Sequence, residues 1–200
     1  DTQMIVVAPA TSLAAGKPSK TVDVRVVNTA GTSNNTAADD YVYYTLTVVN
    51  GSNVQTYSLS DLREREPVSG YWGAHREPEV VNHYIGTSLF DLLGDVGGIP
   101  EGKGLRITAS DGFTVDYEAE RLAAMGDGTY QMWDYGASLD TWSDDIETTG
   151  SVTPVVAYQM DGSALPAGIG PIRVVLLQDN ERMVTEGKYS PRLVTRIEVR

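Results

Sequence analysis

Residues 71–76 hold the side chains best suited to binding a ligand. Tyr71 and Trp72 offer two aromatic faces for stacking, while His75 and Arg76 offer N–H donors for an anion. This combination indicates a ligand cleft. The simpler interpretation, which we favour on the sequence alone, is that the rings only pack over the end of a sheet.

The two histidines, His75 and His83, are the residues most able to bind a metal or act as a catalytic base. They lie eight positions apart, which places them on no common helical face and matches no zinc motif. The chain has no G-x-S-x-G motif, and neither histidine has an identifiable partner for a Ser-His-Asp set. We therefore predict no catalytic residues and no metal site.

Residues 122–172 contain seven carboxylates and no Lys, Arg or His. Four of these carboxylates fall within residues 140–147 and could supply hard oxygen ligands for calcium. The segment lacks the order of an EF-hand loop and its central glycine. A solvated acidic loop is the simpler interpretation, because runs of charge usually form surface faces.

Four aromatic residues accompany this acidic segment, namely Tyr130, Trp133, Tyr135 and Trp142. An acidic, aromatic surface suits the binding of a sugar, a peptide or a neighbouring protein through stacking and hydrogen bonds. The alternative is that these rings anchor an inserted segment onto the core.

Composition excludes several classes of protein. The chain has 200 residues and no cysteine, so disulfides, thiolate metal sites and cysteine nucleophiles are absent. The net charge is −12 and no Lys/Arg cluster stands out, which argues against a nucleic-acid partner. Apolar runs are far shorter than the ~20 residues that span a bilayer, so no transmembrane segment is expected.

Runs of β-branched residues predict most of the secondary structure. The expected strands cover residues 4–8, 21–27, 41–49, 105–109, 113–117, 155–160, 173–177 and 193–199. A hairpin turn is expected at residues 49–52, and Asp111-Gly112 supplies another. Residues 67–84 show no clear periodicity and are predicted to form a long loop.

Helices are expected to be few and short. One begins at Ser58 or Ser60, and a second begins at Ser88 with Asp91 three residues later, as in a capping box. A third covers residues 118–124. The fold class is therefore α+β, with a mixed β-sheet platform, short helices and long irregular loops.

Residues 28–40 contain no large apolar side chain and are predicted to be a loop or linker. We accordingly expect an N-terminal β-strand segment and linker over residues 1–40. One α+β domain is expected over residues 41–200.

Several short motifs follow one another in an informative order: residues 59–62 (LSDL), 84–93 (YIGTSLFDLL), 107–113 (ITASDGF), 170–175 (GPIRVV) and 196–199 (RIEV). In this order they resemble the molybdopterin-binding domain of the sulfite-oxidase-like oxidoreductases. The resemblance covers about residues 41–200 and implies that family's α+β fold, a β-sheet platform with irregular loops over one end.

The chain departs from this family at the reaction centre. In those enzymes a cysteine supplies a thiolate to molybdenum, whereas the corresponding segment here, residues 68–76, contains no sulfur. Neither a hydroxyl nor an imidazole replaces a soft thiolate chemically. Anchoring the cofactor's phosphate calls for several cationic donors, for which only His75, Arg76, Arg173 and Lys188 are suitably placed. The resemblance thus implies a residual ligand cleft formed by Tyr71, Trp72, His75, Arg76 and Arg173.

Three functions are compatible with these features. The first is a noncatalytic binding or interaction module with the molybdopterin-domain fold, with no cofactor expected and an unknown small ligand, glycan or protein as partner. The second is a molybdopterin-dependent oxidoreductase with a non-cysteine metal site. The third is a calcium-dependent adhesion module that uses residues 140–147.

The expected location is extracellular or at a bacterial cell surface. The chain starts at Asp1 without an initiator Met, which suggests a removed signal, and its first fifty residues are rich in Thr, Ser, Asn and Gly.

Overall fold

The computed structural model describes residues 19–23, 25, 27–28, 30–34, 40–75, 81–134 and 146–200. The chain divides into two compact units, Asp1–Thr45 and Leu46–Arg200, and each is described by itself. In the first unit, β1 (Ser19–Asp23) pairs antiparallel with the first residues of β4 (Asp40–Asn50). The short strands β2 (Val27–Asn28) and β3 (Gly31–Thr32) pair with each other. The strand predicted at residues 4–8 lies outside the described residues, and the domain boundary at residue 40 stays a prediction.

The second unit begins with a mixed sheet. Its strands are β5 (Asn53–Ser58), the end of β4, β16 (Val194–Val199), β8 (Leu105–Ala109) and β9 (Thr114–Tyr117). Strand β16 runs parallel to β4 and antiparallel to β8. One face of this sheet faces the core through side chains that are at most 2% exposed, including Leu46, Val48, Leu105, Ile107 and Ile197.

A second sheet is built from β6 (Pro67–Trp72), β7 (Asn82–Ser88), β12 (Thr153–Met160), β13 (Ser163–Ala164) and β14 (Arg173–Leu177). Strand β14 pairs with β12, and its end also meets β6, because Tyr71 and Gln178 exchange two main-chain hydrogen bonds of 2.8 Å. This contact brings the two ends of the sheet together. Gly70 makes it possible, since a Cβ atom there would lie 2.8 Å from the carbonyl oxygen of Gln178.

The long loop predicted for residues 67–84 is wrong, because β6 and part of β7 lie within it. Pro67 occupies the first position of β6, where a strand tolerates proline. Gly70 serves the close strand contact rather than a turn. These two residues remove the alternating pattern that would have indicated a strand.

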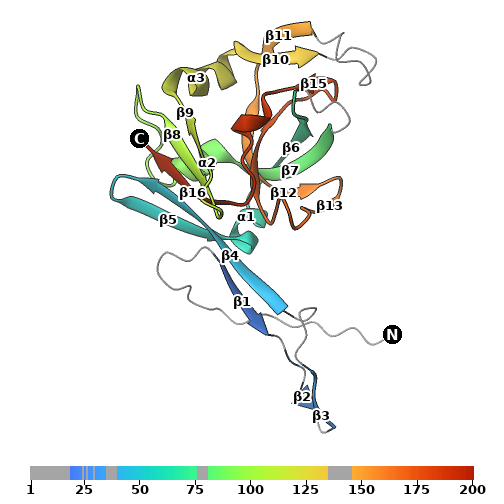
Figure 1. Ribbon diagram of the computed structural model, residues 1–200. Helices are drawn as coiled ribbons and strands as arrows, with labels where there is room; N and C mark the ends of the chain where they lie inside the picture. The colour runs from blue at the N-terminus through green and yellow to red at the C-terminus, as the bar shows by residue number, and fades with distance from the viewer. Residues whose placement is uncertain are drawn as a thin grey trace. The chain divides into compact units, whose positions relative to one another are not determined.

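A small third sheet was also not predicted from the sequence. It contains β11 (Ile146–Gly150), β10 (Tyr130–Asp134) and β15 (Met183–Val184), and Figure 1 shows β10 and β11 side by side near α3 (Ala119–Asp127). Tyr130 is 2% exposed, so this aromatic ring packs into the core. Tyr135, Trp142 and most of the proposed calcium segment lie outside the described residues.

The remaining helices begin where the sequence predicts. Ser58 caps α1 (Leu59–Arg63) through a capping box with Asp61. Ser88 caps α2 (Leu89–Gly94), whose buried face consists of Leu89, Leu92 and Leu93. The structure confirms a mixed α+β fold that is mostly sheet with few short helices. Among the described residues, no helix has the length and apolar character needed to span a membrane.

Candidate functional site

The segment that joins β15 to β16, residues 186–193, lines three surface pockets of the second unit. It contains a 3-10 turn, η2 (Gly187–Tyr189). Main-chain hydrogen bonds fix both sides of the segment: Val174 N–H donates to the Pro191 carbonyl at 3.0 Å, and Ser110 N–H donates to the Leu193 carbonyl at 2.9 Å. The pocket-lining side chains are therefore carried on a backbone tied to β14 and β8.

Arg173 and Trp72, two residues of the predicted cleft, do meet in the structure. The guanidinium of Arg173 lies 4.4 Å from the centre of the Trp72 ring and donates a 2.9 Å hydrogen bond to the Ser190 carbonyl. The indole N–H of Trp72 donates to Thr185 Oγ1 at 3.0 Å. Arg173 is 3% exposed and Trp72 is 5% exposed, so this part of the predicted cleft is filled by packed protein.

Tyr84 completes this buried cluster. Its hydroxyl accepts a long hydrogen bond of 3.4 Å from Arg173 Nη1, and its ring meets that of Trp72 edge to face. Burial raises the pKa of Tyr84, and the nearby Arg173 charge opposes part of that rise. The phenol therefore stays protonated at neutral pH and acts as a structural partner of the cation.

The other predicted cleft residues lie apart from this cluster. Tyr71 packs edge to face on His83, with ring centres 5.3 Å apart. His75 stacks on Trp133, with ring centres 3.8 Å apart and planes that differ by 3°. Arg76 lies outside the described residues. The cleft expected from the sequence is thus divided between a buried cluster and two aromatic pairs.

Residues 187–193 contribute to a pocket of about 380 Å³, which we call the Ser190 pocket. Its lining includes Ser190, Lys188, Arg192, Phe113 and Gly168. Ser190 is 3% exposed, and its hydroxyl has no hydrogen-bond partner among the described residues. Lys188 and Arg192 are both exposed cations. Sequence reasoning noted Lys188 but missed Ser190 and Arg192, which carry no motif of their own.

Backbone strain accompanies this pocket. Leu193, which also lines it, has a φ angle of +52°, in the left-handed region that bulky residues rarely adopt. Such conformations cost free energy and cluster at ligand sites, where surrounding contacts hold them in place. Here the hydrogen bond from Ser110 N–H to the Leu193 carbonyl is one such contact.

The donor set does not fit the molybdenum centre that the family resemblance implies. The metal there requires a thiolate, and this chain has no cysteine. Arg173 would be needed for an anionic group of the cofactor, but it already donates to Ser190 and Tyr84 inside the core. Among the described residues, no group of three or more His, Asp or Glu side chains could hold a metal ion.

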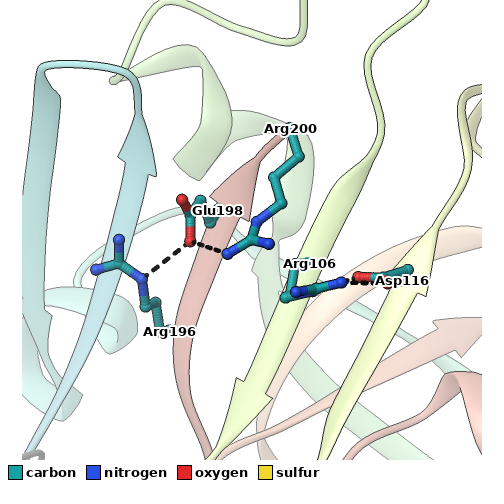
Figure 2. A network of polar contacts seen from close by, with 5 residues as sticks. All are labelled: Arg106, Asp116, Arg196, Glu198 and Arg200. Atoms are coloured by element: carbon teal, nitrogen blue, oxygen red, sulfur yellow. Dashed lines mark hydrogen bonds and ion pairs between the residues drawn. The ribbon is translucent and has the colours of Figure 1, made fainter.

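A second polar region lies on the solvent side of β8, β9 and β16 (Figure 2). Arg106 makes two hydrogen bonds of 2.7 Å to Asp116, and both Arg196 and Arg200 donate to Glu198. Hydrogen bonds from Arg106 lower the pKa of Asp116, and those from Arg200 and Arg196 lower the pKa of Glu198. Every charge drawn in this network is paired with another, so these side chains link neighbouring positions on the surface of the sheet.

Comparison with known proteins gives a distant structural likeness. Neither family models nor curated protein sequences match this chain. Among solved structures, the crystal structure of the sulfane dehydrogenase SoxCD from Paracoccus pantotrophus is similar, with a TM-score of 0.50 and 17% sequence identity. The similarity covers 78% of this chain but only 38% of that chain. At this identity it shows the fold alone, and it supports the sulfite-oxidase-like fold class that the sequence motifs imply.

Proposed function

We propose that this chain is a noncatalytic binding module with a sulfite-oxidase-like fold, and that its Ser190 pocket holds a small anionic ligand. The observation that carries the proposal is the buried Ser190 hydroxyl, which has no hydrogen-bond partner among the described residues and lines a pocket with two cations. The proposal includes an exported or surface-attached location, which rests on the composition of the N-terminal residues.

The chemistry of the pocket favours an anion. A buried hydroxyl without a partner costs roughly 1–3 kcal/mol, and a ligand that accepts its hydrogen bond would recover much of this. Arg192 supplies a charged donor in the same pocket, and Lys188, whose ammonium also pairs with Glu186 at 3.0 Å, supplies a second. Arg side chains bind carboxylates and phosphates with two parallel hydrogen bonds. Asp111 is the one carboxylate in the lining, and it accepts a hydrogen bond from Phe113 N–H.

The same residues argue against catalysis in this pocket. A nucleophile such as a serine hydroxyl requires an adjacent general base. Neither histidine lines the Ser190 pocket: His75 stacks on Trp133, and His83 packs against Tyr71. We therefore infer that the pocket retains and releases its ligand without changing it, and we propose no sulfane dehydrogenase activity for this chain.

Calorimetric titration of the full chain with inorganic phosphate tests this proposal. Arg192→Ala should weaken binding about 10-fold or more, because a hydrogen bond to a charged group contributes about 1.5–3 kcal/mol. Phe90→Ala, which changes an exposed ring on α2 that lines none of the three pockets, is the matched control and should bind like the parent chain. Absence of saturable binding, or equal binding by Arg192→Ala, would refute the proposal.

Metal analysis addresses the competing enzyme hypothesis. Protein purified from a host that makes molybdopterin should contain molybdenum far below one atom per chain. About one tightly bound atom per chain would instead favour a molybdopterin-dependent oxidoreductase with a non-cysteine metal site, and it would contradict the noncatalytic module.

A further inference from the structure

A second pocket, also lined by part of residues 186–193, has a different chemical character. We call it the Trp133 pocket. Its volume is about 400 Å³, and it is lined by His75, Trp133, Glu186, Gly187 and Lys188. This volume falls in the range of small-molecule sites, about 300–1,000 Å³. One of its residues, Trp133, belongs to the acidic, aromatic segment of residues 122–172.

Strand β10 holds the ring of Trp133, and the residues that follow β6 hold the ring of His75. Trp133 lies on β10, where it is paired in register with Val184 of β15 and Glu147 of β11. His75 N–H donates to the Thr185 carbonyl at 2.7 Å, which ties the end of the β6 segment to β15. The two rings stack face to face, with nearly parallel planes and centres 3.8 Å apart. Each ring covers one face of the other, and the outer face of this fixed pair is an aromatic surface that a ligand need not order.

The two charged side chains that line the pocket have opposite signs and form an ion pair. Lys188 Nζ lies 3.0 Å from Glu186 Oε1, and hydrogen bonding to this carboxylate raises the pKa of Lys188. Arg121 lies 3.7 Å from the other oxygen of Glu186. Glu186 and Lys188 therefore bring an acceptor and a donor to the pocket at close spacing. This arrangement suits a neutral ligand whose neighbouring groups donate and accept hydrogen bonds.

We propose that the Trp133 pocket binds a neutral sugar ring. A sugar presents C–H groups on the faces of its ring, which pack on an aromatic surface, and hydroxyl groups around its rim, which both donate and accept. Trp133 and His75 provide the aromatic surface, Glu186 accepts from one hydroxyl, and Lys188 donates to another. This site adjoins the proposed anion pocket, and the two share Gly187 and Lys188.

Saturation-transfer NMR on the full chain tests the proposal with glucose, galactose, mannose and N-acetylglucosamine as probes. Glucuronate serves as the charged counterpart of glucose. We expect saturable binding of at least one neutral sugar below about 20 mM, with the strongest transfer to its ring C–H protons. Glucose should bind at least as tightly as glucuronate.

Variants assign the signal to the pocket. Trp133→Ala should lower the affinity for the sugar about 10-fold or more, and Phe90→Ala should leave it unchanged. Because Trp133 also packs between strands, Glu186→Gln provides a second variant at a half-exposed side chain, with an expected loss of several-fold. No saturable signal from any neutral sugar, a clear preference for glucuronate, or full binding by Glu186→Gln would overturn the proposal. Phosphate binding is measured separately, so failure here leaves the anion site to be judged by its own titration.

Discussion

Two polar regions of the second unit differ in how completely their groups are paired. On the outer face of β8, β9 and β16, the five charged residues of Figure 2 form ion pairs with one another at 2.7–3.3 Å. In the Ser190 pocket, by contrast, a buried hydroxyl has no partner among the described residues and a neighbouring leucine is held in the left-handed region. The charges of the first region satisfy one another, whereas the Ser190 hydroxyl has no such partner, and the proposed anion site rests on this contrast.

Under the proposed function, the degree of pairing distinguishes charged groups that stabilise the fold from polar groups that bind the ligand. A paired charge on a sheet surface contributes modestly to stability. A buried polar group without a partner lowers stability, and Ser190 combines this property with a place in a pocket that two cations line. Charge content alone would have selected the wrong region, since the paired face holds more arginines than the pocket.

Loss of Arg173 should produce the largest effect, because this cation supports the wall behind the pocket. Arg173→Met removes donors to the Ser190 carbonyl and the Tyr84 hydroxyl, and both acceptors would be left buried. We expect a loss of roughly 2–4 kcal/mol in the free energy of unfolding. Urea unfolding followed by circular dichroism measures it, with Arg192→Met as the exposed control. If the Arg173→Met chain were as stable as the parent, the buried cluster of Arg173, Trp72 and Tyr84 would not be a structural support.

A smaller loss is expected in the paired region. Glu198→Gln removes the carboxylate shared by Arg196 and Arg200, and it should lower the free energy of unfolding by about 0.5–1 kcal/mol at neutral pH.

The difference in the free energy of unfolding between the parent and Glu198→Gln should depend on pH. The two arginines lower the pKa of Glu198 in the folded chain. The stability that the carboxylate contributes is therefore present above the pKa of an unfolded glutamate, about 4.3, and is lost as the pH falls through the lower folded value. Urea unfolding at a series of pH values should show the parent and Glu198→Gln converging in acid. A gap that widens in acid would contradict the assignment.

Ser190→Ala is the variant from which no loss of stability is expected. Because the hydroxyl has no partner among the described residues, its removal relieves the cost of burying it and should raise the free energy of unfolding by about 1 kcal/mol. Phosphate affinity should nevertheless fall several-fold. Parallel urea unfolding and calorimetry measure the two quantities. A large loss of stability with unchanged phosphate affinity would show that Ser190 stabilises the fold and does not bind the anion.

Local signals in the sequence predicted much of the fold. Ser58 and Ser88 begin helices as expected, because capping depends on residues within one turn. Strands β8, β9, β12, β14 and β16 follow the β-branched runs, and the Asp111-Gly112 turn joins β8 to β9. These features depend on neighbours in the chain, so the residue types report them directly.

Contacts between distant segments were harder to predict. Strand β6 carries Gly70 because its backbone approaches Gln178, more than one hundred positions away, and the same glycine removes the strand pattern. The sequence named Arg173, Trp72 and His75 as site residues but could not tell buried packing from an open cleft. It gave no signal for the Ser190 hydroxyl, since a missing hydrogen-bond partner is a property of the folded chain alone.

Amide chemical shifts recorded during titration with inorganic phosphate test the central claim most directly. The account predicts saturable shifts centred on Lys188, Ser190 and Arg192, with a common dissociation constant, and their loss in Arg192→Ala. Unchanged amides in this segment at saturating phosphate, or shifts confined to Arg106, Arg196 and Arg200 on the paired face, would contradict it.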